Sequence, residues 1–374
     1  MTVRGSAAVV LRAHRTNLAQ PPGSLLEVVT LPSREPAAGQ VRVRNMFQQV
    51  IAANGDLMFE TSPIPVPVFR VGEPLYGGAI GRIVESRAED LPVGAVVLHM
   101  SGWREESILG PGEAFPVPDG VFPGPEYLLN QGVPAYHGIV DIAAVGEGDV
   151  VLVSGAAGGV GSMAAQIAKA RGAAYVIGIA GGPEKCRFLV DELGLDAAID
   201  HRNDDIDDRL SKLAPEGISV FFDTVGGSQF EAALRHAAFG ARFALCGILA
   251  GQVAGGEGGH PRLDIMTAIV HEVQIRPFTT RHTPGQIQAW NTHYARWYAE
   301  GRITYAHTLL EGSLARAVTA QDELLAGVHR GNVIVRLADD VADAHTHADP
   351  HTHTHTHTTV APGRDGRPDG DYAS

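Results

Sequence analysis

Three glycines, Gly155, Gly158 and Gly161, recur at a spacing of three in the stretch SGAAGGVGSMAAQ. Because glycine has no Cβ, a ligand can come close to the backbone of such a turn. A helix that begins there also offers free backbone N–H donors and the positive end of its dipole. These properties suit a diphosphate, and we expect the two neighbouring residues of the turn, Gly159 and Val160, to share in the contact.

The elements on either side must support this interpretation, since a glycine triplet alone is a weak signal. The β-rich run DVVLVS precedes the turn, and the amphipathic run SMAAQIAKARG follows it. From Gly148 to about Leu249 the same unit repeats: a short apolar run, a turn, and an amphipathic segment closed by glycine. Parallel strands need connections of this length. The sequence therefore predicts an α/β fold with a doubly wound parallel sheet, in which SQFEAALRHAAFG is a helix and ARFALCGI is a strand.

The chain before this region has a different pattern. Proline- and glycine-rich stretches separate short strand-like pieces such as QVRVRNMF, YGGAIGRIV and GAVVLHM, which indicates a β-rich, barrel-like domain. Near the other end, AHTLLEGSLARAV and NVIVRL would suit a return to that first domain. We expect the β-rich domain to comprise 1–130 and 309–337, the sheet domain 131–308, and the His/Thr-rich segment 338–374 to be disordered.

Composition limits the class of partner. The chain of 374 residues has a formal net charge of −13, which disfavours nonspecific nucleic-acid binding and docking on an anionic membrane. No apolar run approaches the length that spans a bilayer, and we expect a cytoplasmic protein that binds a small molecule. Two cysteines are too few for a disulfide framework or a four-thiolate zinc site.

The end of the second predicted strand bears on the choice of nucleotide. Enzymes that bind NAD usually carry an acidic residue there, which accepts hydrogen bonds from the ribose 2′-hydroxyl. This chain reads GIAGGPEK instead, so Gly181 presents no carboxylate and Lys185 offers a cation to a 2′-phosphate. NADPH is the expected cofactor, although spacing alone fits an ordinary exposed helix lysine equally well.

A long stretch, from VLVSGAAGGVGSMAAQIAKARG to GLDAAID, resembles the zinc-independent alkenal and prostaglandin double-bond reductases of the medium-chain dehydrogenase/reductase superfamily. The resemblance continues at FFDTVGG and LCGI, with weaker echoes over most of residues 1–337. It implies a GroES-like β-rich domain, a Rossmann domain, NADPH, a homodimer and no metal. The Gly-His-Glu run of the zinc enzymes is also missing from YGGAIGRI. Further cofactor contacts implied by the resemblance are His201, Thr224, Cys246, Gly247 and His329.

The same resemblance exposes departures at the reacting end. The family places a tyrosine beside the substrate carbonyl, in a Cys-Gly-x-Ile-Ser-x-Tyr-Asn motif, where this chain reads CGILAGQV and has Gln252. An amide can polarise a carbonyl but cannot practically give up a proton at neutral pH. The family's Val-Asp-Pro-x-Met-Arg segment likewise reads VIAANGD. Protonation could fall to water, to a cofactor hydroxyl, or to a side chain such as Tyr76, Tyr136 or His137.

Two hypotheses of function follow. The first is an NADPH-dependent reductase acting on the activated C=C bond of a hydrophobic α,β-unsaturated carbonyl compound, with Gln252 as the polarising group. The second is a member of the same fold that no longer transfers hydride, such as a cyclase or isomerase in specialised, polyketide-type metabolism, because fold alone does not fix chemistry.

Overall fold

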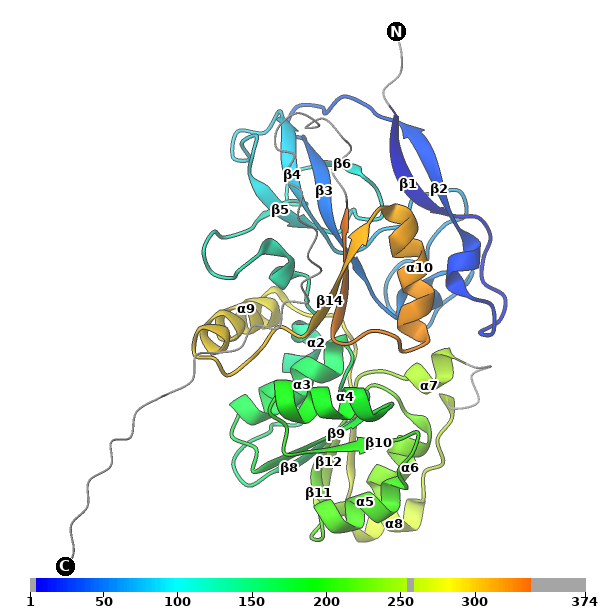
Figure 1. The fold of residues 1–374 in the computed structure, drawn as a ribbon, viewed down its shortest axis with the longest axis vertical. Helices are drawn as coiled ribbons and strands as arrows, with labels where there is room; N and C mark the ends of the chain where they lie inside the picture. Colours follow the sequence, from blue (N-terminus) through cyan, green and yellow to red (C-terminus); the bar gives the residue numbers. More distant parts are fainter. Residues whose placement is uncertain (1–4, 254–258, 338–374) are drawn as a thin grey trace, which may run out of the picture. The chain divides into compact units, whose positions relative to one another are not determined.

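Six parallel strands form the sheet that carries the glycine turn, as seen in the computed structural model, which describes residues 5–253 and 259–337. The strand order is β10-β9-β8-β11-β12-β13, so the direction of winding changes between β8 and β11 (Figure 1). Ligands of open α/β sheets bind at such a switch point, outside the carboxyl ends of the strands. The strands are β8 (Val150–Val153), β9 (Tyr175–Ala180), β10 (Ala197–Asp200), β11 (Ile218–Asp223), β12 (Ala237–Leu245) and β13 (Gln274–Pro277).

Alternating side chains of these strands enter two different cores. Val151 and Val153 of β8 belong to one apolar cluster, and Leu152 between them belongs to another. Such burial on both faces explains why the strands read as continuous apolar runs. The connecting helices are α3 (Gly159–Ala170), α4 (Pro183–Arg187) with a π-helical continuation over Phe188–Glu192, α5 (Ile206–Leu213), α6 (Gly227–Arg235) and α8 (Ile265–Val270).

A second sheet contains the strands predicted at both ends of the chain. Its order is β14-β15-β3-β4-β5-β7, with β6 paired to β3, and β15 runs antiparallel to β3. The C-terminal strands β14 and β15 thus lie in the same sheet as β3, and the fold class is as expected: a β-rich part and a Rossmann-like parallel-sheet part. The strands are β3 (Val41–Val50), β4 (Ala79–Ser86), β5 (Val96–His99), β6 (Glu106–Leu109), β7 (Phe115–Pro116), β14 (His307–Gly312) and β15 (Asn332–Leu337).

The remaining elements complete the two cores. β1 (Gly5–Leu11) and β2 (Leu26–Pro32) form a separate antiparallel pair. α9 (Pro284–Ala299), which starts with a capping box at Thr283, buries Trp290 and Trp297 in the core beside α3. The other helices are α1 (Asn54–Leu57), α2 (Gly132–Tyr136) with a π-helical continuation over His137–Ile142, α7 (Leu249–Gln252) and α10 (Leu314–Leu325), together with 3₁₀ turns at Pro22–Leu25 and Pro125–Leu128.

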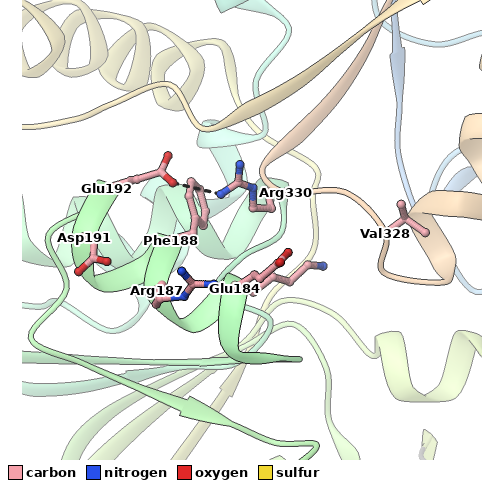
Figure 2. Close-up of a pocket in the computed structure, with 8 residues that line it drawn as sticks. Glu184, Arg187, Phe188, Asp191, Glu192, Val328 and Arg330 are labelled. Atoms are coloured by element: carbon pink, nitrogen blue, oxygen red, sulfur yellow. Dashed lines mark hydrogen bonds and ion pairs between the residues drawn. The ribbon is translucent and has the colours of Figure 1, made fainter. Parts of the chain in front are cut away.

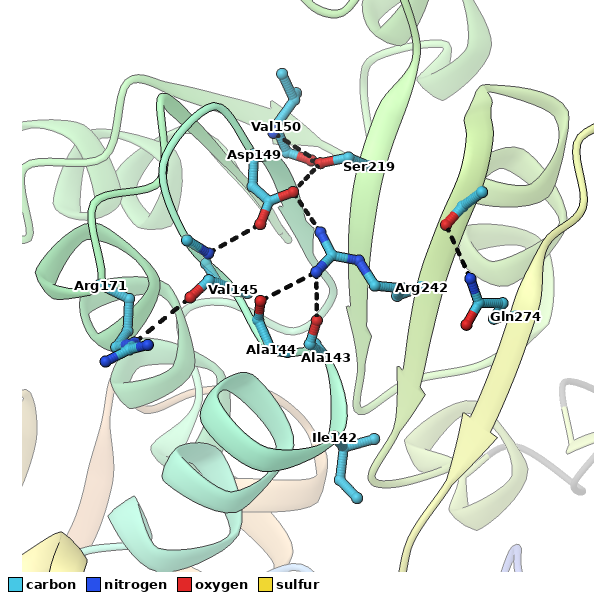
Figure 3. Close-up of polar contacts among 12 residues, drawn as sticks. Ile142, Ala143, Ala144, Val145, Asp149, Val150, Arg171, Ser219, Arg242 and Gln274 are labelled. Atoms are coloured by element: carbon cyan, nitrogen blue, oxygen red, sulfur yellow. Dashed lines mark hydrogen bonds and ion pairs between the residues drawn. The ribbon is translucent and has the colours of Figure 1, made fainter.

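A polar network ties the sheet together at the amino end of β8, away from the glycine turn (Figure 3). Arg242 of β12 is paired with Asp149 and donates to the carbonyls of Ala143 and Ala144 at 2.7 and 3.0 Å. The hydroxyl of Ser219, on β11, donates to the same carboxylate at 2.7 Å. These bonds hold the strands in register, so this polar cluster has a structural role.

One element boundary differs from the prediction. The helix expected over SQFEAALRHAAFG ends at Arg235, and β12 already begins at Ala237. Pairing with β11, in which Ala237 lies opposite Ile218 and a bulge follows, overrides the helical preference of the alanines. The prediction for 338–374 lies outside the described residues. In the described part of the chain, no helix has the length and apolarity to cross a membrane.

Candidate functional site

The glycine turn leads into α3, where the side chains of Gln131 and Asn332 lie against Gly159. Gly155 has φ +56°, a conformation that favours glycine, and Gly158 stands at the N-cap in an extended conformation. A Cβ on Gly161 would lie 2.3 Å from the carbonyl oxygen of Gly155, so any side chain there would push the helix off the turn. Within the described structure, no side chain caps α3. Its first N–H groups are therefore available to an anion, with Gly159 and the half-buried Val160 in the first turn.

The loop after β11 forms the next wall of this site. The buried carboxylate of Asp223 accepts from the Ser154 hydroxyl at 2.6 Å and from the N–H groups of Val225 and Gly226, both at 2.9 Å. The Thr224 hydroxyl donates to the Ser154 carbonyl at 3.0 Å and lies against Gly155. Thr224 is thus held beside the glycine turn.

Cys246 and Gly247 lie on the loop after β12, next to the loop after β11. Their N–H groups donate to the Asp223 carbonyl at 2.8 and 3.1 Å. Burial, followed by the charge of Asp223, raises the pKa of the Cys246 thiol to about 12. The thiol stays protonated at neutral pH, and so this residue can shape the site but is a poor nucleophile.

A cationic cluster of three side chains, Lys185, His201 and Arg202, lies at the ends of β9 and β10. A Cβ on Gly181 would lie 2.9 Å from His201 Nε2 and 2.8 Å from Arg202 Nε. A Cβ on Gly327 would lie 3.8 Å from both Lys185 Nζ and Arg202 Nη2. Burial, and then the charges of Arg202 and Arg330, lower the pKa of Lys185. A cluster whose members disfavour one another's charge is suited to an added anion.

Arg202 is a member of this cluster that the sequence analysis missed. It follows His201 directly, and its own N–H donates to Asp200 Oδ1 at 3.1 Å. That carboxylate also accepts from the N–H of Gly182 at 2.7 Å, so it is engaged by the loop backbone. The signal in the sequence that could have identified Arg202 is its place directly after His201, which the family resemblance implies as a cofactor contact.

A pocket of about 420 Å³ lies beside this cluster (Figure 2). The guanidinium of Arg330 lies 4.9 Å from the Phe188 ring centroid and forms an ion pair with Glu192 at 3.1 Å. Lys185 lines the pocket but donates to the Gly327 carbonyl at 2.7 Å. The full lining is Glu184, Lys185, Arg187, Phe188, Asp191, Glu192, Val328 and Arg330.

The C-terminal loop brings His329 near the glycine turn but gives its ring another partner. The N–H of Gly331 donates to the Ala157 carbonyl at 2.8 Å, which places this loop beside the turn. His329 Nε2 lies 2.7 Å from Glu323 Oε2, and Glu323 is also paired with Arg316. Any contact of His329 with a cofactor would therefore go through its backbone or its other ring nitrogen.

The three proposed catalytic side chains are not brought together as a group. Tyr76 donates its hydroxyl to the Pro67 carbonyl. Tyr136 is buried in the core beside Trp290 and Trp297, and its oxygen lies 3.2 Å from His293 Nδ1. Burial raises the pKa of both tyrosines, which weakens them as acids.

Gln252, at the end of α7, donates its side-chain amide to Asp56 Oδ2 of α1. Asp56 was not predicted from the sequence as a site residue. Burial raises the pKa of this carboxyl, and the Gln252 hydrogen bond and the charge of Arg15 offset part of that rise. His137, the further option named from the sequence, is paired with Asp141 at 2.8 Å.

Metal ligands do not gather in the described residues: 5–253 and 259–337 contain no group of three or more His, Cys, Asp or Glu side chains that could hold a metal ion.

Comparison with known proteins identifies two family models. Residues 9–117 match the N-terminal domain of oxidoreductase, and residues 159–299 match zinc-binding dehydrogenase. The second match begins at Gly159, the first residue of α3, and so includes Gly161 and the strands β9 to β13 but not β8. It carries that description although the Gly-His-Glu run is missing from YGGAIGRI.

Individual relatives align over most of the chain. It is 32% identical to the NADPH-dependent curcumin reductase of Escherichia coli (strain K12) over 313 residues, which are 82% of this chain and 90% of that protein. It is also 32% identical to prostaglandin reductase 1 of Bos taurus over 302 residues, 76% of this chain and 90% of that protein. The crystal structure of CurA in complex with NADPH from Vibrio vulnificus superposes with a TM-score of 0.82 at 30% identity, covering 89% and 100% of the two chains.

Proposed function

This chain belongs to the zinc-independent double-bond reductases of the medium-chain dehydrogenase/reductase superfamily, and we propose that it reduces the activated C=C bond of a hydrophobic α,β-unsaturated carbonyl compound with NADPH. The observation that carries the proposal is the uncapped start of α3 behind a turn in which Gly155 and Gly161 leave no room for a Cβ, together with a cationic cluster at the end of β9. The names of the relatives support both the cofactor and the reaction class.

The described residues fit this cofactor. The diphosphate would lie on the N–H groups of the α3 start, and the 2′-phosphate would lie among Lys185, His201 and Arg202. When bound, NADPH supplies hydride to the β-carbon of the substrate. The remaining proposed contacts are Gly155, Gly158, Gly159, Val160, Gly161, Gly181, Thr224, Cys246, Gly247 and His329.

Gln252 would contact the substrate carbonyl. Its side-chain nitrogen has two hydrogens, and one of them is donated to Asp56. The second can polarise a carbonyl oxygen and stabilise the enolate that develops there. The buried position of Tyr136 and the bond from Tyr76 to Pro67 favour Gln252 over the tyrosines for this role.

A homodimer is the proposed assembly, formed through the β13 edge of the parallel sheet. α8, which follows β12 in the chain, carries four apolar residues that are each 62 to 67% exposed: Ile265, Met266, Ile269 and Val270. β13 is the last strand of the sheet and so presents unpaired backbone groups. A second copy of the chain could cover both features. The cytoplasmic location and the domain boundaries at 130 and 308 stay predictions.

The reductase proposal is tested by mixing the full chain with NADPH and a panel of enones and enals of increasing size. Consumption of NADPH with one or more of them is the expected result. Binding of NADPH without consumption by any member of the panel would contradict the reaction, and absence of NADPH binding would contradict the interpretation of the glycine turn as well.

A further inference from the structure

A polar pair joins two segments that lie 196 residues apart in the chain. Gln252, the last residue of α7, donates its amide to Asp56, which lies in α1. Both side chains are half-buried. The contact brings together the two segments in which this chain departs from the motifs of its family, CGILAGQV and VIAANGD.

The pair is connected to the glycine turn by a short series of contacts. The N–H groups of Leu249 and Ala250 donate to the carbonyls of Thr224 and Val225 at 3.0 and 2.9 Å, so α7 rests on the loop after β11. Thr224 in turn lies against Gly155. α7 therefore stands at the carboxyl ends of the strands, the edge at which ligands of this fold bind.

Burial and two neighbouring groups act on the carboxyl group of Asp56. The Arg15 guanidinium lies close enough to act on its charge, but its hydrogen bonds go to the carbonyls of Gln20, Gly55 and Leu18. The charge of Asp322 also acts on Arg15 and raises its pKa. Burial is the largest effect on Asp56 and raises its pKa, while the Gln252 amide and Arg15 lower it in part.

We propose that Asp56 is the general acid that protonates the α-carbon of the substrate, and that Gln252 is the residue that positions its carboxyl group. The inference rests on the proposed reductase function. It supplies the proton donor that is lost with the missing tyrosine, because the Gln252 amide cannot give up a proton but can orient a carboxyl group that can.

The step balances without a further reactant. When bound, NADPH would supply the hydride for the C–H bond at the β-carbon, and the electrons of the C=C bond would move to the enolate. The O–H bond of the Asp56 carboxyl then breaks, its proton forms the C–H bond at the α-carbon, and water returns a proton to the carboxylate. The substrate is reduced by two electrons and NADPH is oxidised by two.

The primary test compares Asp56→Asn with wild type and with Glu60→Gln, an exposed acid on the same segment. Asparagine keeps an acceptor for the Gln252 amide but has no proton to give. We expect kcat to fall by about 10²-fold or more, within the usual range for loss of a general acid, while the Kd for NADPH stays within about twofold. Glu60→Gln should match wild type. Unchanged kcat in Asp56→Asn, with normal NADPH turnover in wild type, would overturn the role of Asp56 alone, whereas absence of wild-type turnover would overturn the proposed function.

The pH profile of kcat gives a second readout. An acid must be protonated to act, so kcat should fall as pH rises through the pKa of Asp56. Gln252→Ala removes a hydrogen bond that lowers this pKa, and the alkaline limb should move to higher pH. The limb should be absent from Asp56→Asn. If that variant does not fold, the Gln252→Ala profile decides: a limb that does not move overturns the proposal.

Discussion

Lys185 offers a sharp test of the cofactor site, because NADPH carries the 2′-phosphate and NADH does not. Its ammonium has three N–H donors, and one of them is committed to the Gly327 carbonyl at 2.7 Å. Two remain for an anion. The neighbouring charges of Arg202 and Arg330 contribute to its lowered pKa, so a bound phosphate would relieve this repulsion.

The expected loss follows from the strength of a charged hydrogen bond. Removing such a bond costs about 1.5 to 3 kcal/mol, which corresponds to about a 10- to 150-fold rise in Kd. Lys185→Ala should therefore weaken NADPH by that factor. Loss of the bond to Gly327 would also loosen the loop, but this effect weakens NADPH and NADH alike. The ratio of the two Kd values isolates the contribution of the phosphate.

Titration of the full chain with each cofactor, by calorimetry or by fluorescence of the reduced nicotinamide, measures this ratio. Lys212→Ala is the matched control, since that exposed lysine on α5 is paired only with Asp208 at 2.7 Å among the ion pairs of the described residues. Arg202→Ala should resemble Lys185→Ala. Equal losses for NADPH and NADH in Lys185→Ala would show that the lysine does not contact the 2′-phosphate.

The other predictions concern the turn and the assembly. Gly161→Ala should weaken the binding of NADPH and NADH to a similar extent and lower the melting temperature, because its Cβ would lie 2.3 Å from the Gly155 carbonyl oxygen and such overpacking costs about 1 to 3 kcal/mol. Gly146→Ala, where a Cβ meets nothing within 4 Å, is the control. An unchanged Kd in Gly161→Ala would refute the glycine turn as the diphosphate site. Ile269→Asp, at a position that is 62% exposed, should convert a homodimer to a monomer in analytical ultracentrifugation with little change in melting temperature, and a wild-type chain that sediments as a monomer would refute the dimer.

The parallel-sheet part could be predicted well because its signals are local. β8 and β9 are apolar runs, and α3 ends at Ala170 shortly before Gly172. The boundary between α6 and β12 was wrong because pairing with β11 decided it, and pairing depends on residues far apart in the chain.

The site could be predicted only in part, for the same reason. Gly155, Thr224 and Lys185 follow strand ends, so their neighbourhood is implied by the order of elements. The contact between Gln252 and Asp56 depends on how loops of two sheets meet, and no local pattern records it. Tyr136 was a reasonable candidate by residue type, but its packing against Trp290 and Trp297 is visible only in three dimensions.

Hydride transfer from NADPH to the β-carbon is tested most directly by following deuterium from the cofactor to the product. NADPH carrying deuterium at the transferable position of the nicotinamide is incubated with the full chain and an enone that it consumes, and the product is examined by NMR. We expect one deuterium on the β-carbon for each NADPH oxidised, and a solvent-derived hydrogen on the α-carbon. A product that forms without NADPH oxidation, or that has no deuterium on the β-carbon, would contradict this hydride transfer.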